Sequence, residues 1–338
     1  MSLLAESNSL KKVNMRDKIP KMVLIKRIIY GIILIIILGV VFQICYNFFS
    51  KEMIKNKGMY ATVDSKKIYF NSEGVGEYTI IFDGSIGTNM YEWNSAIDEL
   101  ERQGLKTFVY NRNGYGLSSG SNLMTLEQQA EQLNGLLKKA AVGGKYILVG
   151  EEYGSLVLTN YAKLYPENVK GIVLINPINE KDKIQYSSLK NKISLWGKKI
   201  QEIGANCSLT WLLDKIGLTT SYPDFEKGLT EEREKNQYDW LKNQAPYRKA
   251  IYNESKNIYE MNSSSQKDGM FKDVPYYLIT NIKNNPLINL GSKENTTEYY
   301  KEYEKSSFVS QNPKDVSSAV IKVVDQSIRN EAREQQKK

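Results

Sequence analysis

The sequence contains no histidine among its 338 residues. This absence excludes Ser-His-Asp and Cys-His triads, histidine metal sites and every mechanism in which an imidazole transfers a proton. The two cysteines, Cys45 and Cys207, are too few for a thiolate zinc cluster or a disulfide framework. With 41% hydrophobic and 25% charged residues, the composition is nevertheless that of a folded globular chain.

Excess charge is also absent from most of the chain. The net charge is +8, but residues 1–60 hold ten Lys and Arg against three acidic residues. Residues 61–338 then hold 36 basic and 35 acidic residues and are almost neutral. Such a body has no basic surface for nucleic acid, so we expect no nucleic-acid partner.

One long hydrophobic run is present near the start. Residues 28–45 are uncharged, and residues 46–49 extend the run to a length that crosses a bilayer as a helix. A cleaved signal peptide is the alternative, but the run ends in Cys-Tyr-Asn-Phe-Phe rather than in small residues. Seven basic residues precede the run and three follow it. The sequence therefore predicts a single-pass membrane protein with residues 1–27 cytoplasmic, a span at residues 28–49 and an extracytoplasmic body.

After a linker at residues 50–59, the body alternates between two kinds of pattern. Runs typical of strands occur at residues 60–64, 67–70, 78–82, 105–110, 146–149 and 171–175, and helical patterns at residues 89–103, 125–141 and 154–165. Nearly continuous apolar strands separated by helices predict an α/β fold, with a mainly parallel sheet covered on both faces.

This alternation is interrupted between residues 179 and 272, where helical patches replace strands. A strand pattern returns at residues 274–280, residues 308–309 could form a short last strand, and residues 313–329 read as an amphipathic helix. We expect a core of residues 60–178 and 273–330, an inserted helical cap at 179–272 and a polar tail at 331–338.

Four motifs lie in order along this core. They are Asp83-Gly84-Ser85-Ile86-Gly87 followed by Trp93, residues 110–118 (YNRNGYGLS), residues 146–155 (YILVGEEYGS), and Pro166 with residues 169–177. Together they resemble the α/β-hydrolase superfamily over roughly residues 60–330. The resemblance implies the α/β-hydrolase fold, in which helices cover a mainly parallel sheet and a cap is inserted after the sixth strand.

The resemblance also assigns positions to a catalytic triad, but the residues there are different ones. The nucleophile position of the Gly-x-Ser-x-Gly elbow is Glu152, between Gly150 and Gly154. The acid position after the seventh strand is Asn284, and the base position is Ser307. The oxyanion donors would be the N–H groups of Tyr153 and Ser85.

Two classes of function remain open for this chain. The first is a membrane-tethered pseudo-hydrolase that binds a small molecule, lipid or protein partner in its capped cleft. In it, the Glu152 carboxylate could itself occupy the oxyanion donors. The second is an unconventional hydrolase of esters, amides or related substrates that uses Glu152, with a lysine or a second carboxylate as base, Glu151 and Asp83 being the nearest candidates.

Neither class requires a cofactor. Asp83, Glu151 and Glu152 could converge on a hard cation, but three carboxylates from two loops are a weak signal, and no metal is expected.

Overall fold

The computed structural model describes residues 20–54, 58–120, 122–182, 188–260, 264–303 and 307–336. Most of the basic N-terminus predicted for residues 1–27 lies outside these ranges, as do residues 55–57 of the linker and residues 337–338 of the tail.

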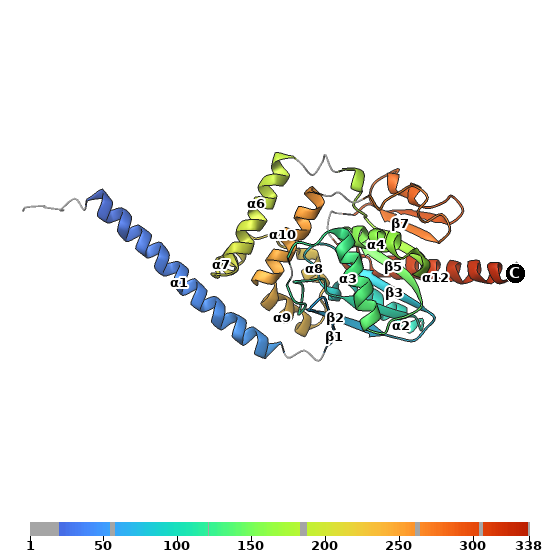
Figure 1. Ribbon diagram of the computed structural model, residues 1–338, viewed down its shortest axis with the longest axis horizontal. Helices are drawn as coiled ribbons and strands as arrows, with labels where there is room; N and C mark the ends of the chain where they lie inside the picture. Colours follow the sequence, from blue (N-terminus) through green and yellow to red (C-terminus); the bar gives the residue numbers. More distant parts are fainter. Residues whose placement is uncertain are drawn as a thin grey trace, which may run out of the picture.

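An eight-stranded sheet forms the centre of the body (Figure 1). Its strands are β1 (Met59–Val63), β2 (Lys66–Glu73), β3 (Tyr78–Asp83), β4 (Lys106–Tyr110), β5 (Lys145–Glu151), β6 (Val169–Ile175), β7 (Tyr276–Thr280) and β8 (Thr296–Tyr300). The order across the sheet is β1-β2-β4-β3-β5-β6-β7-β8. Only β1–β2 and β2–β4 pair antiparallel, so the predicted mainly parallel sheet is confirmed.

Helices cover both faces of this sheet. Helices α3 (Leu126–Lys139) and α4 (Tyr153–Leu164) pack on one face, where Leu133 and Leu158 join the core. Helices α2 (Asn94–Arg102) and α12 (Pro313–Gln336) pack on the other face. Both faces of the central strands are therefore dry, which explains their continuous apolar sequence.

Short elements connect these layers. They are η1 (Met90–Trp93), η2 (Pro166–Asn168), η4 (Pro286–Leu290) and α11 (Phe308–Gln311). Two expectations are corrected here. Residues 308–309 lie in α11 rather than in a strand, because the Ser307 hydroxyl accepts a hydrogen bond from the Ser310 N–H and so caps a helical turn. The expected tail at 331–338 is not separate, since α12 continues to Gln336.

The predicted insertion between β6 and β7 is a helical cap. It holds η3 (Glu180–Asp182), α6 (Leu189–Gly204), α7 (Leu209–Lys215), α8 (Pro223–Gly228), α9 (Glu232–Leu241) and α10 (Ala245–Tyr259). Figure 1 shows α6 and α10 side by side, and their packing joins the two longest cap helices.

The hydrophobic run near the N-terminus forms one helix, α1 (Lys21–Met53), that projects from the body (Figure 1). Within its segment from Lys21 to Phe49, an 18-residue stretch has a mean hydropathy of 2.9 and is 6% buried. By length and composition it could cross a membrane or serve as a signal sequence. The helix continues to Met53, so the first residues of the predicted linker are helical.

Candidate functional site

The sharp turn between β5 and α4 is formed as the motif predicts. Glu152 has φ 43° and ψ −106°, a conformation that side-chain-bearing residues rarely adopt. A Cβ at Gly154 would collide with the carbonyl oxygen of Asp83, and one at Gly150 would lie 2.9 Å from the Ser155 nitrogen. The two glycines are thus needed for the chain to turn tightly against the end of β3.

The side chain of Glu152 contacts the end of the neighbouring strand β6. It is partly exposed, and its Oε1 accepts a hydrogen bond of 3.4 Å from the Asn176 side chain at the end of β6. Among the described residues it makes no side-chain capping bond to α4. The carboxylate therefore contacts the end of β6 rather than capping α4.

Glu151, the neighbour of Glu152, is directed into the protein and is 1% exposed. Its Oε1 accepts hydrogen bonds from the N–H groups of Phe308, at 2.6 Å, and Val309, at 3.3 Å. Its Oε2 lies 3.2 Å from the hydroxyls of both Ser85 and Ser307. Glu151 thus joins the elbow to the loops that carry the expected oxyanion and base positions.

A residue that sequence analysis did not single out, Glu92, completes this cluster. It is buried at the end of η1 and accepts hydrogen bonds from Ser307, at 2.8 Å, and Thr88, at 2.7 Å. The only signal in the sequence is an acidic residue next to Trp93 within an otherwise apolar helical stretch. Ser307 has a single hydroxyl proton, so it cannot donate to both carboxyl groups at once.

Burial determines the charge of this pair. Loss of hydration raises the pKa of Glu92, and it raises the pKa of Glu151 well above its usual range, with the Glu92 charge as the next contribution. The raised pKa values favour a proton on the pair, and a protonated carboxyl group can donate to the Ser307 oxygen while the Ser307 hydroxyl donates to the other carboxyl group.

The expected acid position, Asn284, is not part of the cluster. It is exposed in the turn after β7 and has φ 56°, a left-handed conformation that asparagine tolerates well. The next residue, Asn285, is the buried one, and its side chain bonds to Thr280 and to the N–H of Leu287. The structure therefore brings Ser85, Glu151 and Ser307 together and leaves Asn284 outside.

Asp83 belongs to a second buried cluster, centred on Arg112. The Arg112 guanidinium pairs with Asp83, and its Nε lies 2.7 Å from Glu254 on cap helix α10. It also donates to the carbonyl oxygens of Gly84, at 2.8 Å, and Ser85, at 2.9 Å. One cation therefore connects the cap to the loop of the expected oxyanion donor.

Aromatic side chains enclose this cation. Its Cζ lies 5.4 Å from the ring centre of Tyr115 and 5.2 Å from that of Tyr153. Burial alone would lower the pKa of Arg112, but Asp83 and Glu254 raise it well above its usual range, so the side chain stays charged. Breaking such a network leaves buried charges without partners.

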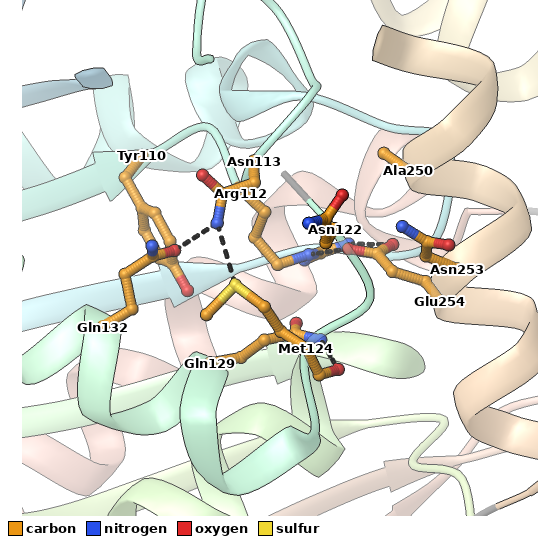
Figure 2. A pocket seen from close by; sticks show the side chains of 10 residues that line it. All are labelled: Tyr110, Arg112, Asn113, Asn122, Met124, Gln129, Gln132, Ala250, Asn253 and Glu254. Carbon is orange, nitrogen blue, oxygen red and sulfur yellow. Dashed lines mark hydrogen bonds and ion pairs between the residues drawn. The ribbon is translucent and has the colours of Figure 1, made fainter. Parts of the chain in front are cut away.

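Figure 2 shows a small polar cavity beside the Arg112–Glu254 pair. Its volume is about 30 Å³, which suits water-sized molecules rather than an organic substrate. Among the described residues, Asn113 Oδ1 and Gln129 Oε1 are buried near it without a hydrogen-bond donor. The cavity is therefore polar but too small to be a substrate site.

The carboxylates of Asp83, Glu151 and Glu152 do not converge on one point. They turn towards Arg112, Phe308 and Asn176 respectively. Within the described ranges, no group of three or more Cys, Asp or Glu side chains is arranged to hold a metal ion.

Known proteins resemble the chain in sequence and in structure. A family model described as the alpha/beta hydrolase fold matches residues 78–195. The uncharacterized protein YqjL of Bacillus subtilis is 30% identical over 106 residues, covering 31% of this chain and 42% of the relative. The putative methylesterase 11 of Arabidopsis thaliana is 27% identical over 100 residues, covering 29% of this chain and 25% of the relative. These matches span less than half the length of either relative.

A solved structure extends the comparison over most of the chain. The epoxide hydrolase CorEH has a TM-score of 0.60 at 15% identity, covering 80% of this chain and 99% of that one. At this level of identity the likeness concerns the fold alone. The sheet order, the elbow, the cap and these matches agree: the chain has the α/β-hydrolase fold.

Proposed function

We propose that this protein is a membrane-tethered, non-catalytic member of the α/β-hydrolase fold that binds a ligand between its cap and its core. One observation carries the proposal. The sequence has no histidine, and the side chain at the base position, Ser307, is bonded to the buried carboxyl groups of Glu92 and Glu151. A hydrolase of the usual type needs a base there that can accept a proton from the nucleophile.

The environment of the elbow supports the same proposal. Glu151 is the nearest alternative base, but it is buried and its Oε1 already accepts hydrogen bonds from the N–H groups of Phe308 and Val309. Asp83, the other alternative, is paired with Arg112 and bonded by the Tyr110 hydroxyl at 2.7 Å. Both carboxyl groups are therefore already engaged by other partners.

We further propose that α1 is an uncleaved anchor with its span at residues 28–49. The larger number of basic residues before the span supports a cytoplasmic N-terminus and a body outside the cytoplasmic membrane. In this position the body would bind its ligand, a small molecule, a lipid or a protein partner, at the membrane surface.

An unconventional hydrolase is the second candidate, and the strained elbow favours it. A positive φ at a residue other than glycine costs about 1–3 kcal/mol and persists where the surrounding structure holds it in place. A carboxylate nucleophile at Glu152 would attack the carbonyl carbon of an ester and form a mixed anhydride, while the alcohol leaves with a proton from water. Water would then hydrolyse the anhydride to the free acid and restore Glu152. The putative methylesterase among the similar sequences suggests an ester as the substrate.

Ester turnover by the full-length protein in detergent distinguishes the two candidates. We expect a panel of aryl and methyl esters to be hydrolysed no faster by the wild type than by the Glu152→Gln variant. Turnover that Glu152→Gln abolishes without changing the melting temperature would contradict the proposal. Mass spectrometry after turnover in heavy-oxygen water provides a second measurement, because water that attacks the Glu152 carbonyl carbon of the anhydride leaves its oxygen in the Glu152 carboxylate.

A further inference from the structure

Two cap helices expose an unusual amount of apolar surface. On α6, Leu189, Ile193, Trp196, Ile200 and Ile203 recur every three or four residues, and each is between 43% and 74% exposed. Leu209 and Leu212 of α7, and Ile216 and Leu218 just after it, are exposed as well. Spacing of this kind places the α6 side chains on one face of the helix. Several exposed apolar side chains on one face of a helix indicate a surface that a membrane, a ligand or another protein covers.

The same hairpin contacts α1 at the turn between its two helices. The Ser208 hydroxyl lies 3.0 Å from the Gly39 carbonyl oxygen and 2.9 Å from Gln43 Oε1. A Cβ at Gly39 would collide with the carbonyl oxygen of Cys207, so the missing side chain allows the two backbones to approach. Gln43 is 5% exposed on a helix that is otherwise mostly exposed.

Aromatic pairs extend this contact towards the body. The rings of Phe42 and Trp211 have their centres 5.4 Å apart, and those of Tyr46 and Trp240 are 4.8 Å apart. Figure 1 shows α7 beside the middle of α1. The apolar face of the hairpin is therefore continuous with the apolar surface of α1.

The position of the contact along α1 gives the depth of the contact in the bilayer. Gly39 lies ten residues before Phe49, the last residue of the proposed span, which corresponds to about 15 Å of helix. The hydrocarbon core of a bilayer is about 30 Å thick, so the contact lies near its centre. A helix of the length of α6 reaches from this depth back to the headgroups.

Several polar groups of the hairpin are paired within the protein, among them Lys199 and Glu202, which form an ion pair of 2.7 Å. The Ser208 hydroxyl is bonded to α1, and the Asn206 amide lies 3.3 Å from the carbonyl oxygens of Glu202 and Ile203. Hydrocarbon requires polar groups to be satisfied within the protein in this way. The exposed Lys190 and Lys192 lie at the opposite end of α6, where they would meet lipid headgroups.

We infer that the α6–α7 hairpin inserts into the outer leaflet of the bilayer beside α1, as a second membrane-embedded element. The inference rests on the anchoring of α1 in the proposed function. The occupant of the apolar face is lipid, and the cap of the fold then opens against the membrane rather than towards bulk water.

Fluorescent labels at single cysteines test this inference in the full-length protein. The background is Cys45→Ser with Cys207→Ser, reconstituted into vesicles of phosphatidylcholine and phosphatidylglycerol. An environment-sensitive label is placed at Ile203→Cys or Ile193→Cys on the hairpin. Ile282→Cys is the matched control, since Ile282 is 51% exposed and lies in the loop after β7. A label at the native Cys45, with only Cys207→Ser, reports on α1.

We expect lipids brominated along their chains to quench the labels at Ile203→Cys and Cys45 and to leave Ile282→Cys unquenched. Ile193→Cys, nearer the headgroups, should be quenched less than Ile203→Cys. Quenching at Cys45 without quenching at either hairpin site would overturn the inference and leave the anchor intact, whereas no quenching at Cys45 would overturn the anchor itself. A hairpin label that changes with protein concentration and not with brominated lipid would mean that a second copy of the chain covers this face.

Discussion

The Ser307 hydroxyl lies 2.8 Å from the Glu92 carboxylate, although 215 residues separate the two in the chain. The loop that would carry a catalytic base is thereby tied to the helix that follows β3. Glu151 reinforces the tie by accepting hydrogen bonds from Phe308 and Val309. The residue at the expected base position, Ser307, therefore helps to hold α11 against the core.

The buried pair should make stability fall as pH rises. Burial and Glu92 raise the pKa of Glu151 in the folded protein. The unfolded chain releases this proton near pH 4.3, whereas the folded protein holds it to a higher pH. The free energy of unfolding is then highest below the unfolded pKa and falls towards the folded pKa, by at most about 1.4 kcal/mol per pH unit for one proton.

Glu151→Gln removes this loss, because the amide resembles the protonated acid. We expect the variant to gain stability over the wild type as the pH rises from 4 to 8, measured by urea unfolding. Glu127→Gln, which alters a 52% exposed side chain paired with Lys163, is the control and should follow the wild-type curve. Parallel curves for Glu151→Gln and the wild type would show that the pair carries no shared proton.

Backbone strain at the elbow can be measured with glycine. Glu152→Gly relieves a strain of about 1–3 kcal/mol, against about 0.5–1 kcal/mol for the greater freedom of glycine in the unfolded chain. The expected result is an unchanged or higher free energy of unfolding. Glu152→Ala keeps the Cβ and removes the carboxylate, so it separates the two effects. A Glu152→Gly variant less stable than Glu152→Ala would refute the strain.

Much of this architecture follows from the sequence, for a physical reason. Strands β3, β5 and β6 are buried on both faces, so their apolar runs are unmistakable, and the elbow requires Gly150 and Gly154. Strand β8 was not predicted, because it lies at the sheet edge, half exposed, with the mixed sequence TTEYY. The prediction of a short last strand at Phe308–Val309 is wrong, because an apolar pair alone does not distinguish a strand from a helical turn.

The site was predictable only in part. Glu152 at the elbow and Ser307 near it were placed from motif spacing, but Glu92 and Arg112 act through contacts with distant residues. Arg112 meets Glu254, 142 residues away on the cap, and no local pattern reveals such a pairing.

The Arg112 network should be essential to the fold. Arg112→Met leaves Asp83 and Glu254 buried without a counter-charge, at a cost of about 3–5 kcal/mol. Lys181→Met is the control, because the Lys181–Asp268 pair is 3.6 Å long and its side chains are 71% and 69% exposed. Its cost should not exceed about 1 kcal/mol. Chemical unfolding of both variants checks the difference, and equal costs would mean that the network contributes little.

Orientation in the membrane is tested with protease. Added to intact cells, or to spheroplasts where an outer membrane is present, protease should digest the body and spare a tag fused before residue 1. The reason is the greater density of basic residues before the span. Protection of the whole body, with digestion only after lysis, would reverse the proposed topology.

A last prediction concerns which acid would serve an introduced base. In the double variant Glu152→Ser with Ser307→His, the imidazole replaces a hydroxyl that lies 2.8 Å from Glu92 and 3.2 Å from Glu151. A nearby carboxylate should raise the imidazole pKa above its usual 6.5, as nuclear magnetic resonance can follow. Adding Asn284→Asp should leave this pKa and any ester turnover unchanged, because Asn284 is exposed in a turn. Adding Glu92→Gln and Glu151→Gln should lower the pKa again. If Asn284→Asp instead raises the imidazole pKa while the glutamine substitutions have no effect, an acid at position 284 can still pair with the base. Glu92 and Glu151 would then not serve as its partner.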